Sequence, residues 1–255
     1  MPVTGDTHFW QGWRSWRHVI KVDPDRPLSP ARLKEVLDCG TDAAIVGGTQ
    51  GISAAKVSAT LSALTEAPFP VVVEVSSPEA LVLGPEAFLI PVVLNAGDPH
   101  WIVGAHQQAL AAYLQLTRSA APEPDLPWSR LCPEGYIILN QSSAAARLTS
   151  ARGALGLLDI LAYAEAGEGL LQMPIIYLEY SGTYGDEAVI AEVRKVLGRA
   201  RLFYGGGIDG PERAGRMARL AHTVVVGNLV HTGSGQDLAE TVAVVRETAP
   251  VAGRE

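Results

Sequence analysis

The chain has 255 residues, of which 47% are hydrophobic and 18% are charged, so it can build one sizeable globular core. Its net charge of −7 argues against a general nucleic-acid binder. No apolar run approaches the roughly 18 residues of a membrane span, and residues 1–16 contain no apolar signal-peptide core. Cys39 and Cys132 form no CxxC pair, as expected for thiols of a reducing compartment. We therefore expect a cytoplasmic protein without a transmembrane segment.

The N-terminal half alternates apolar runs, which predict strands, with amphipathic runs, which predict helices. Strands are predicted over residues 18–23, 43–48, 71–75 and 88–95, and helices over residues 30–39, 53–66 and 99–117. The first helix begins at Ser29-Pro30, an N-cap residue followed by a proline. Residues 76–86 contain two prolines and a glycine and are too short for a crossover helix with its loops. The connection between the third and fourth strands is therefore expected to be irregular.

Two segments stand outside this alternation. Residues 1–16 form an N-terminal extension with Trp10, Trp13 and Trp16 at a spacing of three. Such a stripe covers one end of a core more often than it forms a lid. Residues 119–133 carry four prolines and no period, which predicts a loop.

The C-terminal half repeats the alternation. Strands are predicted over residues 136–140, 175–180, 201–207 and 223–228, and helices over residues 151–172, 186–198, 211–220 and 236–247. Apolar strands without polar alternation, separated by helices, indicate a parallel sheet that is buried on both faces. Eight such units in about 250 residues favour a single-domain α/β fold, a (β/α)8 TIM barrel over residues 1–255, rather than an open doubly wound sheet.

The sixth predicted strand contains one charged residue, Glu179, among apolar and aromatic neighbours. A carboxylate in such a run is costly to bury unless it is paired or has a chemical role. A salt bridge to a neighbouring strand and a catalytic role are about equally expected from this feature alone. Ser181-Gly182 follows the strand, so backbone N–H groups can approach a ligand there. Active sites of TIM barrels lie at this C-terminal end of the strands.

The seventh and eighth strands both end in small residues. Gly205, Gly206 and Gly207 end one strand, and Gly227-Asn228 ends the next. Barrels often bind phosphate in the loops after these two strands, where glycines leave backbone N–H groups exposed. We favour a phosphate site over a mere tight turn because two adjacent strands carry the same signature.

The first strand carries Lys21 and Asp23 on the same face, since Val22 separates them. They form either a salt bridge or a pair consisting of a phosphate-binding ammonium and a Mg²⁺-binding carboxylate, to which Thr49 adds an oxygen. Histidine and cysteine spacings do not suit zinc, and Walker, GxGxxG and GxSxG motifs are absent. Together these residues suit a phosphorylated acceptor that meets a diphosphate substrate.

The sequence resembles the geranylgeranylglyceryl and heptaprenylglyceryl phosphate synthase family of barrel prenyltransferases. The similar stretches follow one another over nearly the whole chain, at residues 18–24, 40–51, 91–95, 134–140, 177–185, 202–209 and 225–228. The resemblance implies transfer of a polyprenyl group from a prenyl diphosphate to the hydroxyl of a phosphorylated three-carbon acceptor, sn-glycerol-1-phosphate. An ether forms and diphosphate is released.

The resemblance also implies residue roles. Asp23 and Thr49 would hold Mg²⁺ on the prenyl diphosphate, and Glu179 would take the proton of the attacking hydroxyl. The residues that it assigns to the acceptor are Lys21, Tyr177, Leu178, Glu179, Tyr180, Ser181, Gly182, Gly207, Gly227 and Asn228. Ala109 stands where members that form C20 products carry a bulky Trp, which implies a longer chain. A homodimer and peripheral membrane contact are further implications.

Three alternatives stay open. A branch of the family transfers a farnesyl group to 3-phosphoglycerate in moenomycin-type antibiotic pathways, and the departure at Gln141-Ser142-Ser143 leaves the acceptor open. Such an acceptor needs one more cation for its carboxylate, and the sequence does not identify it. Phosphate loops also suit a sugar-phosphate isomerase or aldolase, although Lys21 beside Asp23 lacks the isolated setting of a Schiff-base lysine. A barrel that binds a phosphorylated ligand without catalysis is the third alternative.

Overall fold

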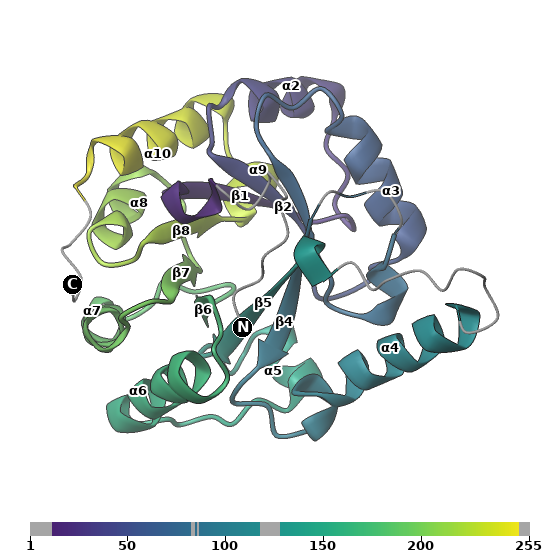
Figure 1. Ribbon diagram of the computed structural model, residues 1–255. Helices are drawn as coiled ribbons and strands as arrows, with labels where there is room; N and C mark the ends of the chain where they lie inside the picture. The colour runs from purple at the N-terminus through teal and green to yellow at the C-terminus, as the bar shows by residue number, and fades with distance from the viewer. Residues whose placement is uncertain (1–11, 83–84, 86, 118–127, 250–255) are drawn as a thin grey trace.

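The computed structural model describes residues 12–82, 85, 87–117 and 128–249. Eight parallel strands form a closed barrel in sequence order, and helices surround it (Figure 1). The strands are β1 (His18–Val22), β2 (Ala43–Val46), β3 (Val71–Glu74), β4 (Phe88–Val93), β5 (Leu131–Ile138), β6 (Ile175–Glu179), β7 (Arg201–Gly205) and β8 (Thr223–Val226). The predicted (β/α)8 barrel is confirmed.

The helices include several short ones. The α-helices are α2 (Pro30–Asp38), α3 (Ala54–Ala63), α4 (Gly104–Thr117), α5 (Ala144–Thr149), α6 (Leu157–Glu165), α7 (Glu187–Val196), α8 (Pro211–Ala218), α9 (Asn228–Thr232) and α10 (Gly235–Glu247). The short helical turns are η1 (Trp13–Ser15), η2 (Pro78–Ala80), η3 (Pro99–Trp101), η4 (Trp128–Arg130) and the π-helical η5 (Ala166–Leu170). Among the described residues, none of these helices is long and apolar enough to cross a bilayer.

Two predicted boundaries are wrong. β5 begins at Leu131, inside the predicted proline-rich loop, whose residues 119–127 lie outside the described ranges. Pro133 is tolerated in this strand because β5 pairs only with β4 there, and its ladder with β6 begins at Glu134. The helix predicted over residues 151–172 is also wrong at its start, because α5 ends at Thr149, its C-cap Ser150 has a φ of 50°, and α6 begins only at Leu157.

Inward and outward side chains alternate along each strand and fill two separate cores. On β6, Ile175 and Tyr177 belong to the core inside the barrel, whereas Ile176 and Leu178 belong to the core beneath the helices. The same alternation directs Lys21, Glu74, Tyr136 and Glu179 into the barrel, toward the C-terminal ends of the strands. The barrel therefore collects polar side chains at one end of its interior.

The hydrogen-bonded ladder between β3 and β4 is short. The β3–β4 ladder ends at Glu74 and Leu89 in the described structure, although the β4–β5 ladder continues to Val93. Pro91 has no N–H for a further bond, and its carbonyl instead accepts from Nε2 of His106 on α4, at 3.0 Å. In the described part of residues 75–87, only η2 is helical, as the predicted irregular connection requires. The C-terminal part of β4 therefore contacts α4 through Pro91.

The N-terminal tryptophans close the opposite end of the barrel. Trp13 and Trp16 are buried in the inner core, and the carbonyl of Trp16 accepts from Oγ1 of Thr223, the first residue of β8, at 2.7 Å. The interpretation that this stripe covers one end of the core is confirmed for these two residues. Trp10 lies outside the described ranges.

Candidate active site

A cavity of about 950 Å³ opens at the C-terminal ends of the strands. Its polar part lies over the barrel, and its apolar part extends beside β4 toward α4. Nearly all site residues predicted from sequence line this cavity, namely Lys21, Asp23, Thr49, Ala109, Tyr177, Glu179, Ser181, Gly182, Gly207, Gly227 and Asn228.

The other two predicted site residues face away from the cavity. The side chains of Leu178 and Tyr180 lie in the core beneath the helices, where the Tyr180 ring is 6.0 Å from that of Tyr204. This follows from the alternation along β6, because only Tyr177 and Glu179 point inward. Their predicted contact with the acceptor stays a prediction, and it would be made by their backbone atoms.

Glu179 ends β6 and is only 4% exposed. Its Oε1 accepts from the backbone N–H of Ser181 at 2.6 Å, which fixes the carboxyl group at the cavity wall. Burial raises the pKa of Glu179, and the charge of Glu74 raises it further, against the opposing effects of Lys21 and Ser181. Among the described residues, no lysine or arginine pairs with Glu179, so the salt-bridge alternative lacks a partner. Glu179 is a buried carboxyl group suited to proton transfer.

Lys21 pairs with Glu74 rather than with Asp23. Its Nζ donates to both carboxylate oxygens of Glu74, at 2.7 and 3.0 Å, and the Tyr136 hydroxyl donates to the same carboxylate. Burial lowers the pKa of Lys21, but Glu74, Glu179 and Glu134 more than offset this effect, so its pKa lies above the usual value. Glu74 was missed from the sequence, although a single acid ends its apolar strand just as Glu179 ends β6.

Two stacked tyrosines form the floor beneath Glu179. The rings of Tyr136 and Tyr177 are 4.3 Å apart and nearly parallel, at 9°. Lys21 Nζ lies 5.8 Å from the centroid of each ring. A Cβ atom at Gly205 would lie 2.1 Å from the Tyr177 hydroxyl, so the first glycine of the β7 run makes room for this ring. Tyr136 was not singled out from the sequence because a tyrosine in a strand usually only packs.

Glu134 lies deeper in the barrel interior, two residues before Tyr136 on the same strand. It is fully buried, and both of its carboxyl oxygens lack a hydrogen-bond partner in the described structure. Burial raises its pKa well above the usual value, and the charges of Glu74 and Glu179 act in the same direction. Burial therefore favours the neutral form of this carboxyl group. No local pattern in the sequence predicted a role for Glu134, which lies in one of the stretches that carry the family resemblance.

The glycine loops lie together beside Glu179. Gly207 has a φ of 56°, and a Cβ atom there would lie 2.4 Å from the backbone nitrogen of Tyr184, so the loop requires glycine for its tight turn. Gly227 and Asn228 begin α9, a short helix that the prediction missed because it extended β8 to Asn228. The loops after β7 and β8 can make tight turns and also bind phosphate, because both loops line the cavity.

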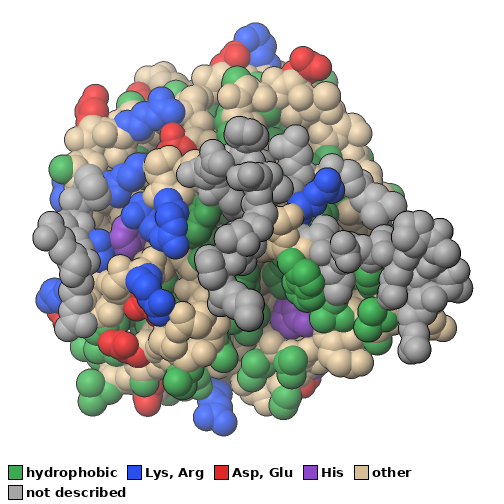
Figure 2. Space-filling view, in the orientation of Figure 1, with side chains coloured by type: hydrophobic (Ala, Val, Ile, Leu, Met, Phe, Trp, Pro, Cys, Tyr) green, Lys and Arg blue, Asp and Glu red, His purple; other side chains and the backbone are tan. Residues whose placement is uncertain are grey.

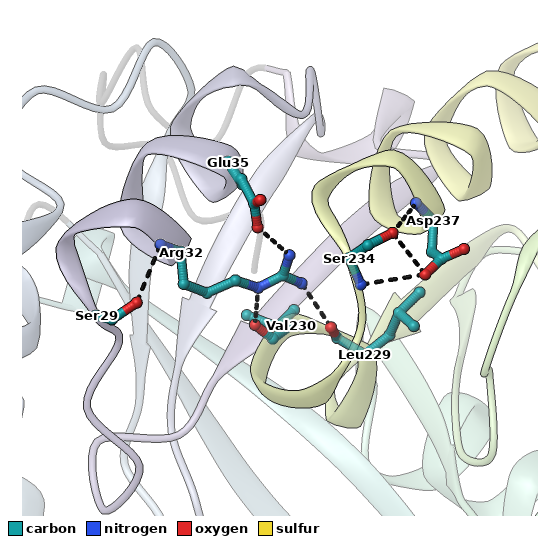
Figure 3. A network of polar contacts seen from close by, with 7 residues as sticks. All are labelled: Ser29, Arg32, Glu35, Leu229, Val230, Ser234 and Asp237. Carbon is teal, nitrogen blue, oxygen red and sulfur yellow. Dashed lines mark hydrogen bonds and ion pairs between the residues drawn. The ribbon is translucent and has the colours of Figure 1, made fainter.

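Arg32 of α2 holds α9 in place (Figure 3). Its guanidinium donates to the carbonyls of Val230 and Leu229, at 2.7 and 2.6 Å, and to Glu35 at 2.7 Å. These carbonyls belong to a helix too short for extensive internal hydrogen bonding. The Arg32 clamp therefore positions the backbone of Gly227 and Asn228 from outside the cavity.

Asp23 and Thr49 lie at the cavity rim. A Cβ atom at Gly48 would lie 2.6 Å from Oδ1 of Asp23, so the end of β2 abuts this carboxylate directly before Thr49. No lysine or arginine pairs with Asp23 within the described part of the chain. No cluster of three or more histidine, cysteine or acidic residues suited to a metal occurs there either. One unpaired carboxylate with a neighbouring hydroxyl fits Mg²⁺ that arrives with substrate phosphates.

Two predicted strand-end asparagines have structural roles. Asn95 is buried and exchanges hydrogen bonds with the backbone of Ile138, donating to its carbonyl and accepting from its N–H at 2.9 Å. Asn140 donates to the carbonyl of Ser181 at 2.5 Å and thereby supports the loop after β6. Neither residue lines the cavity.

The apolar arm of the cavity runs between β4, β5 and α4. Its lining includes Ile90, Pro91, Val93, Trp101, Ala105, His106, Ala109, Leu110 and Tyr113. Three further lining residues, Leu81, Trp128 and Leu148, are exposed, with 53%, 56% and 46% of their surface accessible. Figure 2 shows hydrophobic side chains gathered beside α4, whereas Lys and Arg side chains gather over α8 and α10. A long apolar group fits this arm.

The chain is similar to proteins of one family. Residues 11–246 match the model of the PcrB family. A heptaprenylglyceryl phosphate synthase of Geobacillus kaustophilus is 44% identical over 236 residues, which cover 92% of this chain and 95% of the relative. A geranylgeranylglyceryl phosphate synthase of Methanospirillum hungatei is 37% identical over 235 residues, which cover 92% and 98%, respectively.

A solved structure supports the fold. The (S)-3-O-geranylgeranylglyceryl phosphate synthase from Thermoplasma acidophilum, in complex with sn-glycerol-1-phosphate, superposes with a TM-score of 0.75. It is 22% identical and covers 91% of this chain, which in turn covers 94% of that structure. At this identity, the similarity establishes a shared barrel.

Proposed function

Because this chain belongs to the PcrB family, we propose that it is a prenyltransferase that joins a polyprenyl group from its diphosphate to the hydroxyl of glycerol phosphate. An ether forms and diphosphate is released. The observation that carries this proposal is a single cavity with a buried carboxyl group beside two glycine loops and an apolar arm leading away. Family membership replaces the isomerase, aldolase and non-catalytic alternatives.

Glu179 acts as the general base. The acceptor hydroxyl oxygen attacks the first carbon of the prenyl group, and the bond from this carbon to the diphosphate breaks with its electron pair on the diphosphate. The hydroxyl proton passes to the Glu179 carboxylate. Its raised pKa makes this carboxylate a stronger base, and the Ser181 N–H holds it in position.

The loops after β7 and β8 hold the acceptor phosphate. Gly207, Gly227 and Asn228 present backbone to the cavity, and Ser181 and Gly182 extend this surface toward Glu179. Lys21 adds a positive charge beneath the acceptor, and Tyr177 supports it from the floor. An acceptor held by its phosphate in these loops places its hydroxyl over Glu179.

Asp23 and Thr49 would hold Mg²⁺ together with the prenyl diphosphate. A bound Mg²⁺ neutralises charge on a departing diphosphate. The protein contributes one carboxylate and one hydroxyl from the lining of the cavity.

The apolar arm binds the polyprenyl chain, and Ala109 on α4 leaves it open. We propose a chain longer than C20, in keeping with the heptaprenyl product in the names of relatives such as that of Geobacillus kaustophilus. The exposed hydrophobic residues at the arm support peripheral contact with a membrane that carries the prenyl substrate. A cytoplasmic homodimer completes this proposal.

Crossing acceptors with donors tests the proposed function. The protein is incubated with Mg²⁺, with either sn-glycerol-1-phosphate or 3-phosphoglycerate, and with C15, C20 or C35 prenyl diphosphate. We expect product from sn-glycerol-1-phosphate with the C35 donor. Product only from 3-phosphoglycerate with the C15 donor would instead support the antibiotic-type reaction.

A further inference from the structure

Arg26 lines the polar part of the cavity, next to both phosphate-handling elements. Its Nη1 donates to Oδ1 of Asn228, the first residue of α9, at 3.3 Å. Its backbone N–H donates to the carbonyl of Asp23 at 3.0 Å, within the turn that follows β1. Arg26 thus connects the loop after β8 with the segment that carries Asp23.

The turn directs Arg26 back over the end of the barrel. The Asp25 N–H donates to Oδ1 of Asp23 at 2.9 Å, and Pro24 occupies the second position of the turn. The Asp23 N–H donates to Nε2 of His231 in α9, at 3.1 Å. These two hydrogen bonds fix the turn that carries Arg26 against α9.

The negative charge of the substrates explains why an unpaired cation is needed in the polar part of the cavity. A phosphate monoester carries about 1.5 to 2 negative charges at neutral pH, and a prenyl diphosphate brings further negative charge. The positive charge of Lys21 is already matched by Glu74. Within the described residues, no carboxylate pairs with Arg26, and the amide oxygen of Asn228 is the only acceptor that its guanidinium contacts. Most of its guanidinium donors are thus available to a ligand.

We propose that Arg26 is a further substrate-binding residue, which donates to phosphate oxygens of a substrate in this cavity. Two sources supply these oxygens, the acceptor phosphate beside Asn228 and the diphosphate beside Asp23. A guanidinium binds either with paired hydrogen bonds, which a lysine cannot reproduce. The inference rests on the proposed function for the identity of these substrates.

Calorimetric titrations of the full chain test Arg26 without requiring turnover. Wild type, Arg26→Gln and Arg26→Lys are each titrated with sn-glycerol-1-phosphate, and separately with inorganic diphosphate in the presence of Mg²⁺. Arg219→Gln, an exposed arginine outside the cavity, is the matched control. We expect Arg26→Gln to raise the Kd of one probe roughly 10- to 100-fold, Arg26→Lys to recover part of this loss, and the control to match wild type.

The probe that is affected identifies the oxygen source. A raised Kd for sn-glycerol-1-phosphate places Arg26 on the acceptor, and a raised Kd for diphosphate places it on the donor. Both Kd values within about twofold of wild type in folded Arg26→Gln would overturn the inference. Arg26→Met, which keeps the alkyl chain, replaces Arg26→Gln if that variant is unstable. The product assay separately decides the proposed function, so either idea can fail alone.

Discussion

The backbone N–H of Ser181 donates to Oε1 of Glu179 at 2.6 Å, which ties the carboxyl group at the end of β6 to the loop that follows it. Asn140 supports the same loop through the Ser181 carbonyl, at 2.5 Å. The base and the acceptor-binding backbone are therefore parts of one short segment. Movement of the acceptor site relative to the base is limited by these two contacts.

Removal of the Glu179 carboxylate should abolish most turnover. Glu179→Gln keeps the side-chain shape and its contact with Ser181 but cannot accept a proton. We expect kcat to fall about 10²- to 10⁴-fold, with the Kd of sn-glycerol-1-phosphate changed little. Steady-state kinetics and calorimetry measure the two quantities. A kcat near that of wild type would exclude Glu179 as the base.

The pH dependence of kcat/KM should reflect the raised pKa of Glu179. A base must be ionised, so activity rises with pH and its acidic limb lies above the ordinary glutamate value of about 4.3. The measurement is a pH–rate profile with the acceptor as the varied substrate. An acidic limb at or below the ordinary value would contradict a desolvated base.

Ala109→Trp should shorten the accepted prenyl chain. Ala109 lines the apolar arm, and an indole ring there fills space between α4 and β4. We expect kcat/KM for the C35 donor to fall at least about tenfold, the loss that steric exclusion worth 1.4 kcal/mol produces, whereas C15 and C20 donors are retained. Ala111→Trp, on the exposed side of α4, is the matched control. An unchanged donor profile would place the limit on chain length elsewhere.

Replacement of Glu134 should stabilise the fold at neutral and alkaline pH. Glu134→Met removes a buried carboxyl group without partners and keeps an unbranched side chain, which is expected to raise the free energy of unfolding by about 1–3 kcal/mol. The native state retains a proton that the unfolded chain releases above about pH 4.3, so wild-type stability falls as pH rises toward the raised native pKa. The advantage of the variant should therefore be larger at pH 8 than at pH 4. Denaturant unfolding at both values measures it, and equal or reduced stability at pH 8 would mean that Glu134 has an unseen partner.

Loss of the Arg32 clamp should weaken acceptor binding more than catalysis. Arg32→Met removes the hydrogen bonds to Val230 and Leu229, which frees α9 to move. We expect KM for sn-glycerol-1-phosphate to rise about tenfold, as loss of a charge-assisted hydrogen bond implies, with kcat changed less. Lys34→Met, an exposed position on the same helix, is the control. If the KM of Arg32→Met equals that of Lys34→Met, α9 does not need the Arg32 clamp for acceptor binding.

The sequence alone predicted those site features that lie within a single strand or at its end. Glu179 interrupts an apolar strand, and the glycines of β7 and β8 end adjacent strands, so both features were recognised without tertiary information. Strand periodicity also implied that Leu178 and Tyr180 point away from Glu179, although the resemblance assigned both to the acceptor. The structure places both side chains in the core beneath the helices, as this alternation implies.

The rest depended on contacts between distant segments. Glu74 ends its strand as Glu179 does, but its role follows from Lys21, 53 residues earlier in the chain. The roles of Arg26 and Arg32 follow only from their contacts with α9, about 200 residues away. The sequence did not predict α9, because the predicted strand was extended to Asn228. Local patterns do not encode such partners.

The most direct test of the proposed function is mass-spectrometric identification of the product made from sn-glycerol-1-phosphate and C35 prenyl diphosphate with Mg²⁺. The account predicts a heptaprenylglyceryl phosphate ether and one released diphosphate per ether from the wild type, and almost none from Glu179→Gln. Diphosphate release without an ether, or an ether formed only on 3-phosphoglycerate, would contradict it.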